Sequence, residues 1–207
     1  ALGLMGMNGE EALCESLEAG DCVAIFYAYK MKTLCKSICA DKVYLAQLNH
    51  LEELPDEIKC SDLRLSCRSV SAWPKMLECD SLVVEFCSEL RELPKLEFAG
   101  SLSFSGQDPS FTLPAGLKIR GDLNVGSEYT SGNVSTLPAD LALGGDLRIS
   151  NCPQLTSIPS AYLTWGPKAD GSAHVISLFN TGVPEASHEW LREADAPNVR
   201  FEISMGW

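Results

Sequence analysis

A short motif that recurs seven times is the feature of this sequence that most restricts its fold. Each copy contains an apolar residue followed by proline, and successive prolines are 19 to 25 residues apart. A period of this length is the signature of a solenoid, in which every repeat forms one coil and packs against its neighbours. The seven steps are Leu54-Pro55, Trp73-Pro74, Leu93-Pro94, Leu113-Pro114, Leu137-Pro138, Ile158-Pro159 and Val183-Pro184.

An alternating segment precedes each step and predicts a short strand. Because side chains alternate between the faces of a strand, the two apolar residues of each segment should point inward. Each proline should hold an extended return, since the repeat is too short to carry a helix there. We therefore predict a right-handed α/β solenoid with about seven parallel strands on its concave side and extended convex returns. The segments are Val43-x-Leu45, Leu63-x-Leu65, Leu82-x-Val84, Leu102-x-Phe104, Leu123-x-Val125, Leu147-x-Ile149 and Ile176-x-Leu178.

The residues between and just after the inward positions should form an outward row on the concave sheet. A broad surface of mixed polarity suits protein recognition through hydrogen bonds and a few anchors, so we predict that this row binds a protein. The alternative is a solvated sheet face without a partner. The candidate binding residues are Arg64, Ser66, Val83, Glu85, Ser103, Ser105, Asn124, Arg148, Ser150, Ser177 and Phe179.

Two repeats are longer than the others. Residues 126–135 are a polar insertion that should form a loop at the strand-exit edge, and residues 165–172 should form one on the return side. Loops on a regular scaffold often carry binding specificity. A neutral insertion is an equal alternative for both.

The N-terminal 41 residues lack the apolar-proline step. We expect a helix from Asn8 or Gly9 to Gly20 and a second from Asp21 to about Ala40, because their apolar residues recur at helical spacing. The pair would form an N-terminal helical cap over residues 1–41, with the repeats in residues 42–184. The apolar face of the second helix would comprise Val23, Ile25, Phe26, Tyr29, Leu34 and Ile38.

The pattern changes again after Pro184. Glu185 begins a predicted amphipathic helix with Trp190 and Leu191 facing inward, and an alternating strand follows from Val199 to Ile203. An atypical unit must cover the open end of a solenoid, so residues 185–207 are predicted to be a C-terminal cap.

The segment from Asp146 to Pro159 shows a Leu-x-Leu-x-x-Asn motif followed by Leu-x-x-Leu-Pro, with conservative replacements. This pattern resembles the leucine-rich repeat, and its short period with proline resembles the bacterial class found in type III secreted effectors. The resemblance covers roughly residues 42–205. The asparagine position is kept at Asn151 and Asn180, whereas Cys67, Phe86 and Gly106 stand there in three other repeats.

The resemblance implies a non-enzymatic interaction module, with a bacterial effector as its expected origin. Some effectors of this class carry a novel E3 ubiquitin ligase domain after the repeats. The alternative function is therefore substrate recognition for a ligase whose catalytic domain is not in this chain.

Charge and cysteine usage restrict partners and compartment. The net charge of −12 disfavours nucleic acid and anionic membranes, because both bind clustered Lys and Arg. No apolar run has the roughly 18 residues that a membrane span needs. An odd number of cysteines, nine, is unlike a disulfide scaffold. We expect a monomeric protein with reduced thiols in the cytoplasm, with delivery into a host cell as the effector alternative.

Cys60-Ser61-Asp62 resembles the Cys-x-acid nucleophile signature of that ligase class. Cys60, however, stands at the same repeat position as Cys79 and Ala99, which indicates a structural role, and no base is evident nearby. We therefore predict no catalytic residue and no enzyme activity.

A metal site and a histidine base were the other chemical possibilities. The set Cys14, Cys22, Cys35 and Cys39 lacks the close-spaced pair typical of zinc sites, so core positions are favoured over a metal site. The three histidines have no nucleophile at a motif spacing. We predict neither a metal nor a cofactor. Asn133-Val-Ser is a glycosylation sequon without meaning in a cytoplasmic protein.

Overall fold

The computed structural model describes residues 1–5, 14–28, 30–94 and 97–204. The chain divides into two compact units, unit 1 (Ala1–Pro94) and unit 2 (Lys95–Trp207), which are described separately. In both units the chain winds through stacked coils, and one strand of each coil joins a parallel main sheet. The fold of both units is thus a parallel-strand solenoid, consistent with a leucine-rich-repeat-like architecture.

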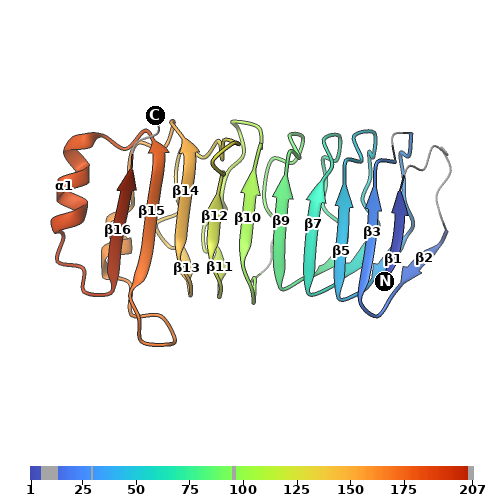
Figure 1. Cartoon of the computed structure of the whole chain (residues 1–207), viewed down its shortest axis with the longest axis horizontal. Helices are drawn as coiled ribbons and strands as arrows, with labels where there is room; N and C mark the ends of the chain where they lie inside the picture. The colour runs from blue at the N-terminus through green and yellow to red at the C-terminus, as the bar shows by residue number, and fades with distance from the viewer. Residues whose placement is uncertain (6–13, 29, 95–96, 205–207) are drawn as a thin grey trace. The chain divides into compact units, whose positions relative to one another are not determined.

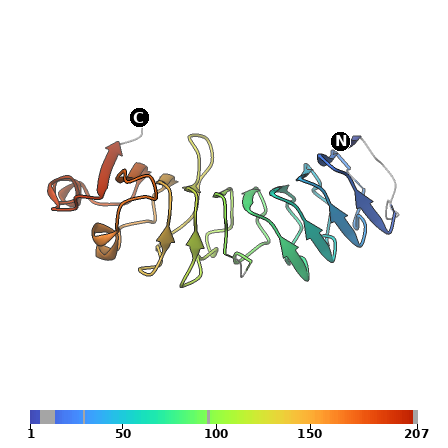
Figure 2. The ribbon, with the colours of Figure 1, turned by 90° about the horizontal axis from the view of Figure 1, so that it is seen from below.

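Unit 1 contains two parallel sheets, and the strands of the main one lie side by side in Figure 1. Its main sheet has the order β1-β3-β5-β7-β9, and the smaller sheet on the return side has the order β2-β4-β6-β8. Seen along the strands, the coils of unit 1 are flattened loops (Figure 2). The main strands are β1 (Leu2–Met5), β3 (Cys22–Phe26), β5 (Lys42–Ala46), β7 (Asp62–Ser66) and β9 (Ser81–Glu85), and the return strands are β2 (Ser16–Glu18), β4 (Ser37–Cys39), β6 (Glu57–Lys59) and β8 (Met76–Glu78).

The two N-terminal helices predicted from the sequence are wrong in the part of the chain that the structure describes. Residues 14–40 form a coil with β2, β3 and β4, and residues 6–13 and Tyr29 lie outside the described residues. The apolar residues expected on the helix face are nevertheless buried, because Val23 and Ile25 point inward from β3 and Ile38 points inward from β4. Pairing of β3 with β5 satisfies the backbone, so a strand forms where the apolar spacing also fits a helix.

Unit 2 has its own parallel main sheet, in the order β10-β12-β14-β15-β16. Its returns contain two short strands and a 3-10 helix, η1 (Ser160–Thr164). The main strands are β10 (Leu102–Ser105), β12 (Leu123–Val125), β14 (Leu147–Cys152), β15 (His174–Thr181) and β16 (Val199–Ser204), and the short return strands are β11 (Lys118–Ile119) and β13 (Ala142–Leu143).

The last part of unit 2 contains the only α-helix of the described residues. This helix, α1 (Glu185–Glu193), follows Pro184 and precedes β16, in the order that the sequence predicts. Leu191 is buried as expected, but Trp190 is 52% exposed, so its predicted inward orientation is wrong. His188 takes the buried place instead, and its Nε2 lies 2.9 Å from the Val183 carbonyl oxygen.

All seven alternating segments predicted from the sequence lie in main-sheet strands, and their apolar residues are buried. The predicted number of about seven strands is too low, because β1, β3 and the terminal β16 also belong to the main sheets. The returns are less uniform than expected. They are paired as strands in most of unit 1, whereas unit 2 uses β11, β13 and η1.

A residue at the C-terminal end of most main strands has an unusual backbone conformation. Asn151 and Asn180 have positive φ, and so do Phe86 and Gly106, which share their position in the repeat. The position therefore selects for a left-handed turn rather than for an asparagine side chain. The full set is Tyr27, Gln47, Phe86, Gly106, Gly126, Asn151 and Asn180.

The residue after this turn points into the core and carries a polar group. Cys87, Gln107 and Cys152 each donate a hydrogen bond to the carbonyl two residues earlier, over 3.5, 3.1 and 3.4 Å. Cys67 belongs to a coil without such a turn, and its thiol donates to the Leu45 carbonyl of the preceding coil. These cysteines therefore satisfy buried backbone oxygens at the strand ends.

Candidate functional site

The outward face of the main sheet in unit 1 is a regular grid of side chains. In-register pairing of β3, β5, β7 and β9 aligns Ala24, Tyr44, Arg64 and Val83 in one row. Phe26, Ala46 and Ser66 form the next row toward the C-terminal ends of the strands. Adjacent strands are about 4.8 Å apart, so neighbours within a row contact each other. We call this surface, with Tyr27, Glu85 and Phe86 at its margin, the unit 1 face.

Aromatic side chains concentrate on the unit 1 face. The rings of Phe26 and Tyr27 lie 6.5 Å apart, and Tyr27 is 41% exposed. Phe86 follows β9 and is 50% exposed. Exposed apolar side chains that gather in one place indicate an interaction surface more strongly than isolated ones do.

Arg64 is the cation in the middle of the unit 1 face. Its guanidinium carbon lies 5.8 Å from the centre of the Tyr44 ring, a cation–π arrangement. The side chain is exposed, and among the described residues it has no carboxylate at ion-pair distance. Arg64 is therefore held in place by stacking while its hydrogen-bond donors remain available.

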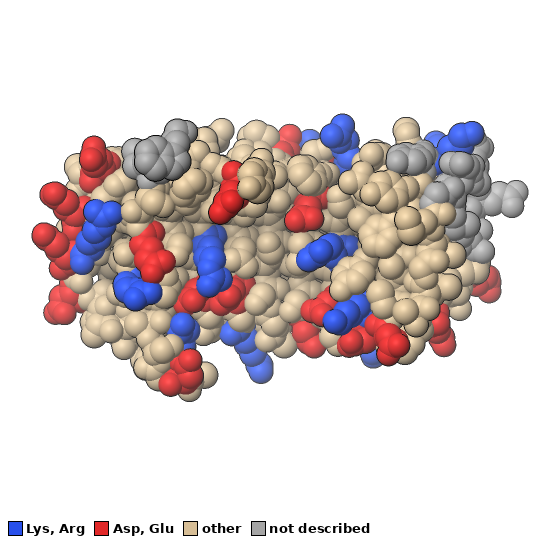
Figure 3. All heavy atoms as spheres, viewed as in Figure 1, with Lys and Arg blue, Asp and Glu red and all other residues tan. Residues whose placement is uncertain are grey.

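The N-terminal ends of the unit 1 strands are acidic. Asp21, Asp41 and Asp80 occupy equivalent exposed positions ahead of β3, β5 and β9, and Asp62 begins β7. In Figure 3 the surface over these strands is mostly uncharged, and acidic side chains with some Lys or Arg among them gather along its lower margin. The unit 1 face thus combines apolar side chains with Arg64 at its centre, and its margin carries several Asp side chains together with Lys42.

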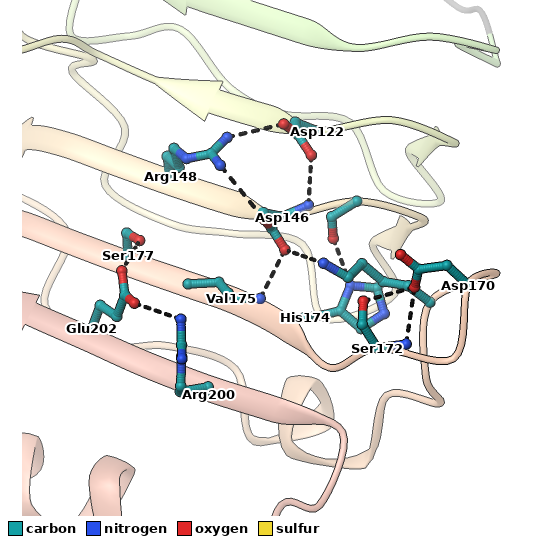
Figure 4. A network of polar contacts seen from close by, with 12 residues as sticks. Asp122, Asp146, Arg148, Asp170, Ser172, His174, Val175, Ser177, Arg200 and Glu202 are labelled. Atoms are coloured by element: carbon teal, nitrogen blue, oxygen red, sulfur yellow. Dashed lines mark hydrogen bonds and ion pairs between the residues drawn. The ribbon is translucent and has the colours of Figure 1, made fainter.

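The corresponding face of unit 2 is polar and internally paired. Ser103, Asn124, Arg148, Ser177 and Glu202 align in one row across its strands. The Arg148 guanidinium contacts Asp122 at 2.9 Å and Asp146 at 3.5 Å (Figure 4). Glu202 accepts hydrogen bonds from Arg200 at 2.8 Å and Ser177 at 3.3 Å. The charges on this face therefore largely satisfy one another.

Asp146 joins the second long insertion to the main sheet of unit 2. Its carboxylate accepts a hydrogen bond from the Val175 N–H at 2.9 Å (Figure 4). It accepts another from Lys168 Nζ at 3.0 Å. Burial opposes the ionisation of Asp146, but the donors from Val175, Lys168 and Arg148 outweigh it and lower the pKa of its carboxyl. The loop that carries Lys168 is therefore anchored, and Asp146 has a structural role.

The first long insertion forms a tight turn at the C-terminal ends of the strands. Ser127 N–H donates to the Thr130 carbonyl at 2.8 Å, and the Asn151 amide donates to the carbonyls of Ser127 and Glu128 at 2.6 and 3.0 Å. Tyr129 stands at the tip and is 93% exposed. The sequon residue Asn133 is half-buried, and its amide nitrogen donates to the Gln107 carbonyl.

The structure places the eleven predicted binding residues on the main sheets, some in unit 1 and some in unit 2. Ser105 is only 6% exposed and so does not contribute to a surface. The Gly106 N–H donates to the Ser131 carbonyl at 2.8 Å, which brings the first insertion over the end of β10. The side chains of Arg64 and Arg148 are exposed. The remaining residues of the set are half-buried: Ser66, Val83, Glu85, Ser103, Asn124, Ser150, Ser177 and Phe179.

The residues of the unit 1 face that the sequence reasoning missed come mainly from β3 and β5. Ala24, Phe26 and Tyr27 were assigned to a helix, and Tyr44 was left out of the outward row. The alternation Val43-Tyr44-Leu45 carries the signal for Tyr44, since it matches Leu63-Arg64-Leu65 one coil later.

Cys60 and His174, two of the groups considered for catalysis, are packed within the coils. Burial raises the pKa of Cys60 to about 12, and the nearby Cys79, Asp62, Asp80 and Asp41 act in the same direction. The His174 ring contacts the Gly145 carbonyl and packs 5.1 Å from Trp165. Within the described ranges, no group of three or more His, Cys, Asp or Glu side chains has an arrangement that could hold a metal ion.

Comparison of the chain with protein-family models, with curated proteins and with solved structures finds no match. The class of this protein therefore comes from its fold alone: a parallel-strand solenoid of stacked coils, consistent with a leucine-rich-repeat-like repeat. The bacterial effector origin implied by the sequence resemblance receives no support from these comparisons. Among the described residues, no helix has the length and apolar character needed to cross a membrane.

Proposed function

We propose that this protein is an interaction module that binds a protein partner through the unit 1 face. The observation that carries the proposal is Arg64, which stacks on Tyr44 in the middle of an aromatic surface and has no ion-pair partner among the described residues. Aromatic and Arg side chains dominate the binding energy of protein interfaces, particularly near the centre. Arg148 supports the choice of face by contrast, because two carboxylates already occupy its guanidinium.

The chemistry of the unit 1 face suggests what the partner presents. An acidic group, placed over Arg64, would form a charge-assisted hydrogen bond, and apolar side chains beside it would cover Phe26 and Tyr27. The acidic margin of Asp21, Asp41 and Asp80 favours basic groups at the periphery of the partner. Such a partner is a protein surface with mixed charge, which fits the net charge of −12 better than a nucleic acid does.

Affinity capture with matched variants tests this function. We expect at least one protein to be retained by the immobilised wild type and by the control Lys59→Glu, which lies in β6 on the return side. Arg64→Glu and Tyr44→Ala should each weaken its binding by about tenfold or more, because each removes half of the stacked pair. Equal retention by all four proteins would overturn the proposal.

The alternative function, substrate recognition for an E3 ubiquitin ligase of bacterial effectors, would use the same surface. Its specific support is the resemblance of the Leu-x-Leu and Leu-Pro pattern to that class. The captured partner distinguishes the two functions: under the alternative, the partner becomes ubiquitinated when this module is joined to its ligase, and not when Arg64→Glu replaces the wild type.

A further inference from the structure

Three pairs of cysteines in unit 1 occupy equivalent positions on neighbouring coils. Backbone pairing establishes the alignment, because Ser16 pairs with Ser37 beside the first pair and the Cys60 N–H donates to the Glu78 carbonyl beside the second. In the third, the Cys67 N–H donates to the Cys87 sulfur at 3.3 Å. The pairs are Cys14 with Cys35, Cys60 with Cys79, and Cys67 with Cys87.

The first of these pairs differs from the others in its access to solvent. Cys14 is exposed and Cys35 is half-buried, whereas Cys60 and Cys79 are both half-buried and Cys67 and Cys87 are both buried. Both thiols of the first pair line a groove of about 480 Å³ on the return side, together with Thr33 and Leu54. A small thiol reagent can therefore reach this pair, on a side of unit 1 remote from the proposed binding surface.

The backbone holds Cys14 and Cys35 at the separation of a disulfide. The Glu15 carbonyl accepts a hydrogen bond from the Lys36 N–H at 2.9 Å, so parallel pairing extends to the residues beside both cysteines. Neighbouring parallel strands are about 4.8 Å apart, and the Cα atoms of disulfides are usually about 4.4 to 6.8 Å apart. The two thiols also share an orientation, since each donates to the carbonyl two residues ahead, at 3.1 and 3.3 Å.

We propose that Cys14 and Cys35 form a redox-active dithiol, which a low-molecular-weight disulfide such as oxidised glutathione converts into an intramolecular disulfide. In the first step the Cys14 thiolate attacks the oxidant, forms a mixed disulfide and releases one glutathione thiolate. In the second, Cys35 loses its proton and attacks Cys14 Sγ, which forms the Cys14–Cys35 bond and releases the second glutathione. The protein loses two electrons, and one oxidised glutathione becomes two reduced molecules.

The surroundings of Cys35 determine which step is slow. Burial, and to a smaller extent the proximity of Cys14, raise the pKa of Cys35 to about 11. At neutral pH only a small fraction of Cys35 is thiolate, so ring closure should limit the rate. Closure should accelerate as the pH rises toward that pKa. In the mixed disulfide Cys14 carries no charge, so only burial still opposes the ionisation of Cys35.

Intact-mass analysis of the folded chain with oxidised glutathione tests the proposal. The disulfide should remove the mass of two hydrogens and two reactive thiols, apart from any glutathione adduct at another exposed thiol such as Cys39, and dithiothreitol should reverse these changes. Tryptic digestion should give a peptide that ends at Lys30 linked to the peptide Thr33–Lys36, since cleavage after Lys32 separates them.

Three cysteine variants make the result specific, and circular dichroism verifies that each is folded. Cys35→Ser should stop at a stable glutathione adduct, and Cys14→Ser should form no disulfide to Cys35. Cys39→Ser, which removes another exposed thiol, should form the same Cys14–Cys35 disulfide as the wild type. A wild type that accumulates a stable adduct without closure, or a linked peptide that persists in Cys14→Ser, would overturn the proposal. The partner-binding experiment is unaffected by either result.

Discussion

At the scale of single residues, the left-handed turns at the strand ends explain sequence variation that looked irregular. Gln47 has φ of 60° and is exposed, yet it carries a side chain that disfavours this conformation. Gln47→Gly should raise the free energy of unfolding by about 0.5 to 1 kcal/mol, because relief of the left-handed penalty exceeds the added entropy of the unfolded chain. Urea denaturation at neutral pH measures the change.

Asn49→Gly is the matched control, because Asn49 is also exposed but does not have positive φ. It should leave stability unchanged or lower it. Equal effects of both substitutions would show that the turn at Gln47 carries no strain.

Residue identity alone predicted these turns poorly. Asn151 and Asn180 suggested an asparagine site, and Phe86 and Gly106 looked like departures from it, although all four share positive φ. A sequence displays side chains, whereas the constraint here acts on the backbone. The buried polar side chain lies one residue after the turn, at Cys87 and Cys152, where the thiol donates a hydrogen bond to a carbonyl of the strand.

At the scale of elements, the ion cluster at Asp146 connects a loop to a sheet. The pKa of this carboxyl is lower in the folded protein, so its contribution to stability is present above the unfolded pKa of about 3.9 and is lost as the pH falls below that value. Asp146→Asn should lower the free energy of unfolding at pH 7 by about 1.5 to 3 kcal/mol, the range for hydrogen bonds to charged groups. Urea denaturation at neutral and acidic pH measures it.

The difference between Asp146→Asn and the wild type should shrink as the pH falls, since the carboxyl becomes neutral in both states. Asp195→Asn, at an exposed carboxylate, should change stability little at either pH. A constant difference between Asp146→Asn and the wild type across the acidic range would mean that the charge of Asp146 is not what anchors Lys168.

The coils of unit 1 show why the strands of the repeats were predictable and the N-terminal elements were not. Leu34-Cys35 stands 20 residues before Leu54-Pro55, and Val23-x-Ile25 stands 20 residues before Val43-x-Leu45. The period was therefore present, but cysteine replaced the proline that marked it. Inward apolar residues define the coil physically, whereas the proline only favours the return.

At the scale of the whole molecule, stacking of repeats places equivalent residues side by side, and this is why the sequence could predict rows of side chains. It could not predict which row is available for binding. Arg64 and Arg148 look equivalent in sequence, but Asp122 lies beside Arg148 only because β12 pairs with β14, whereas β5 brings Tyr44 beside Arg64. The register between neighbouring coils therefore determines which side chains lie beside each Arg, and so whether that Arg is available to a partner.

Alternating charges along the return side of unit 1 should help to fix that register. Glu15 pairs with Lys36 at 2.9 Å, and Asp56 pairs with Lys75 at 2.8 Å, in four consecutive coils. The Glu15 carboxylate, and more weakly Asp56, raise the pKa of Lys36. We call the row of Glu15, Lys36, Asp56 and Lys75 the charge ladder. A coil shifted by one repeat would place like charges together, so the ladder favours the native order of stacking.

Lys36→Glu would place acidic side chains at three neighbouring positions of the ladder, between Glu15 and Asp56. It should therefore lower the thermal midpoint of unfolding. The loss should shrink as NaCl rises from about 0.02 M to about 0.5 M, because the screening length falls below the distances between the exposed charges. Lys30→Glu makes the same change in net charge at an exposed position outside the ladder and should lower the midpoint less. Thermal unfolding followed by circular dichroism measures both variants. An equal loss in both would mean that net charge, rather than the order of charges along the coils, determines the effect.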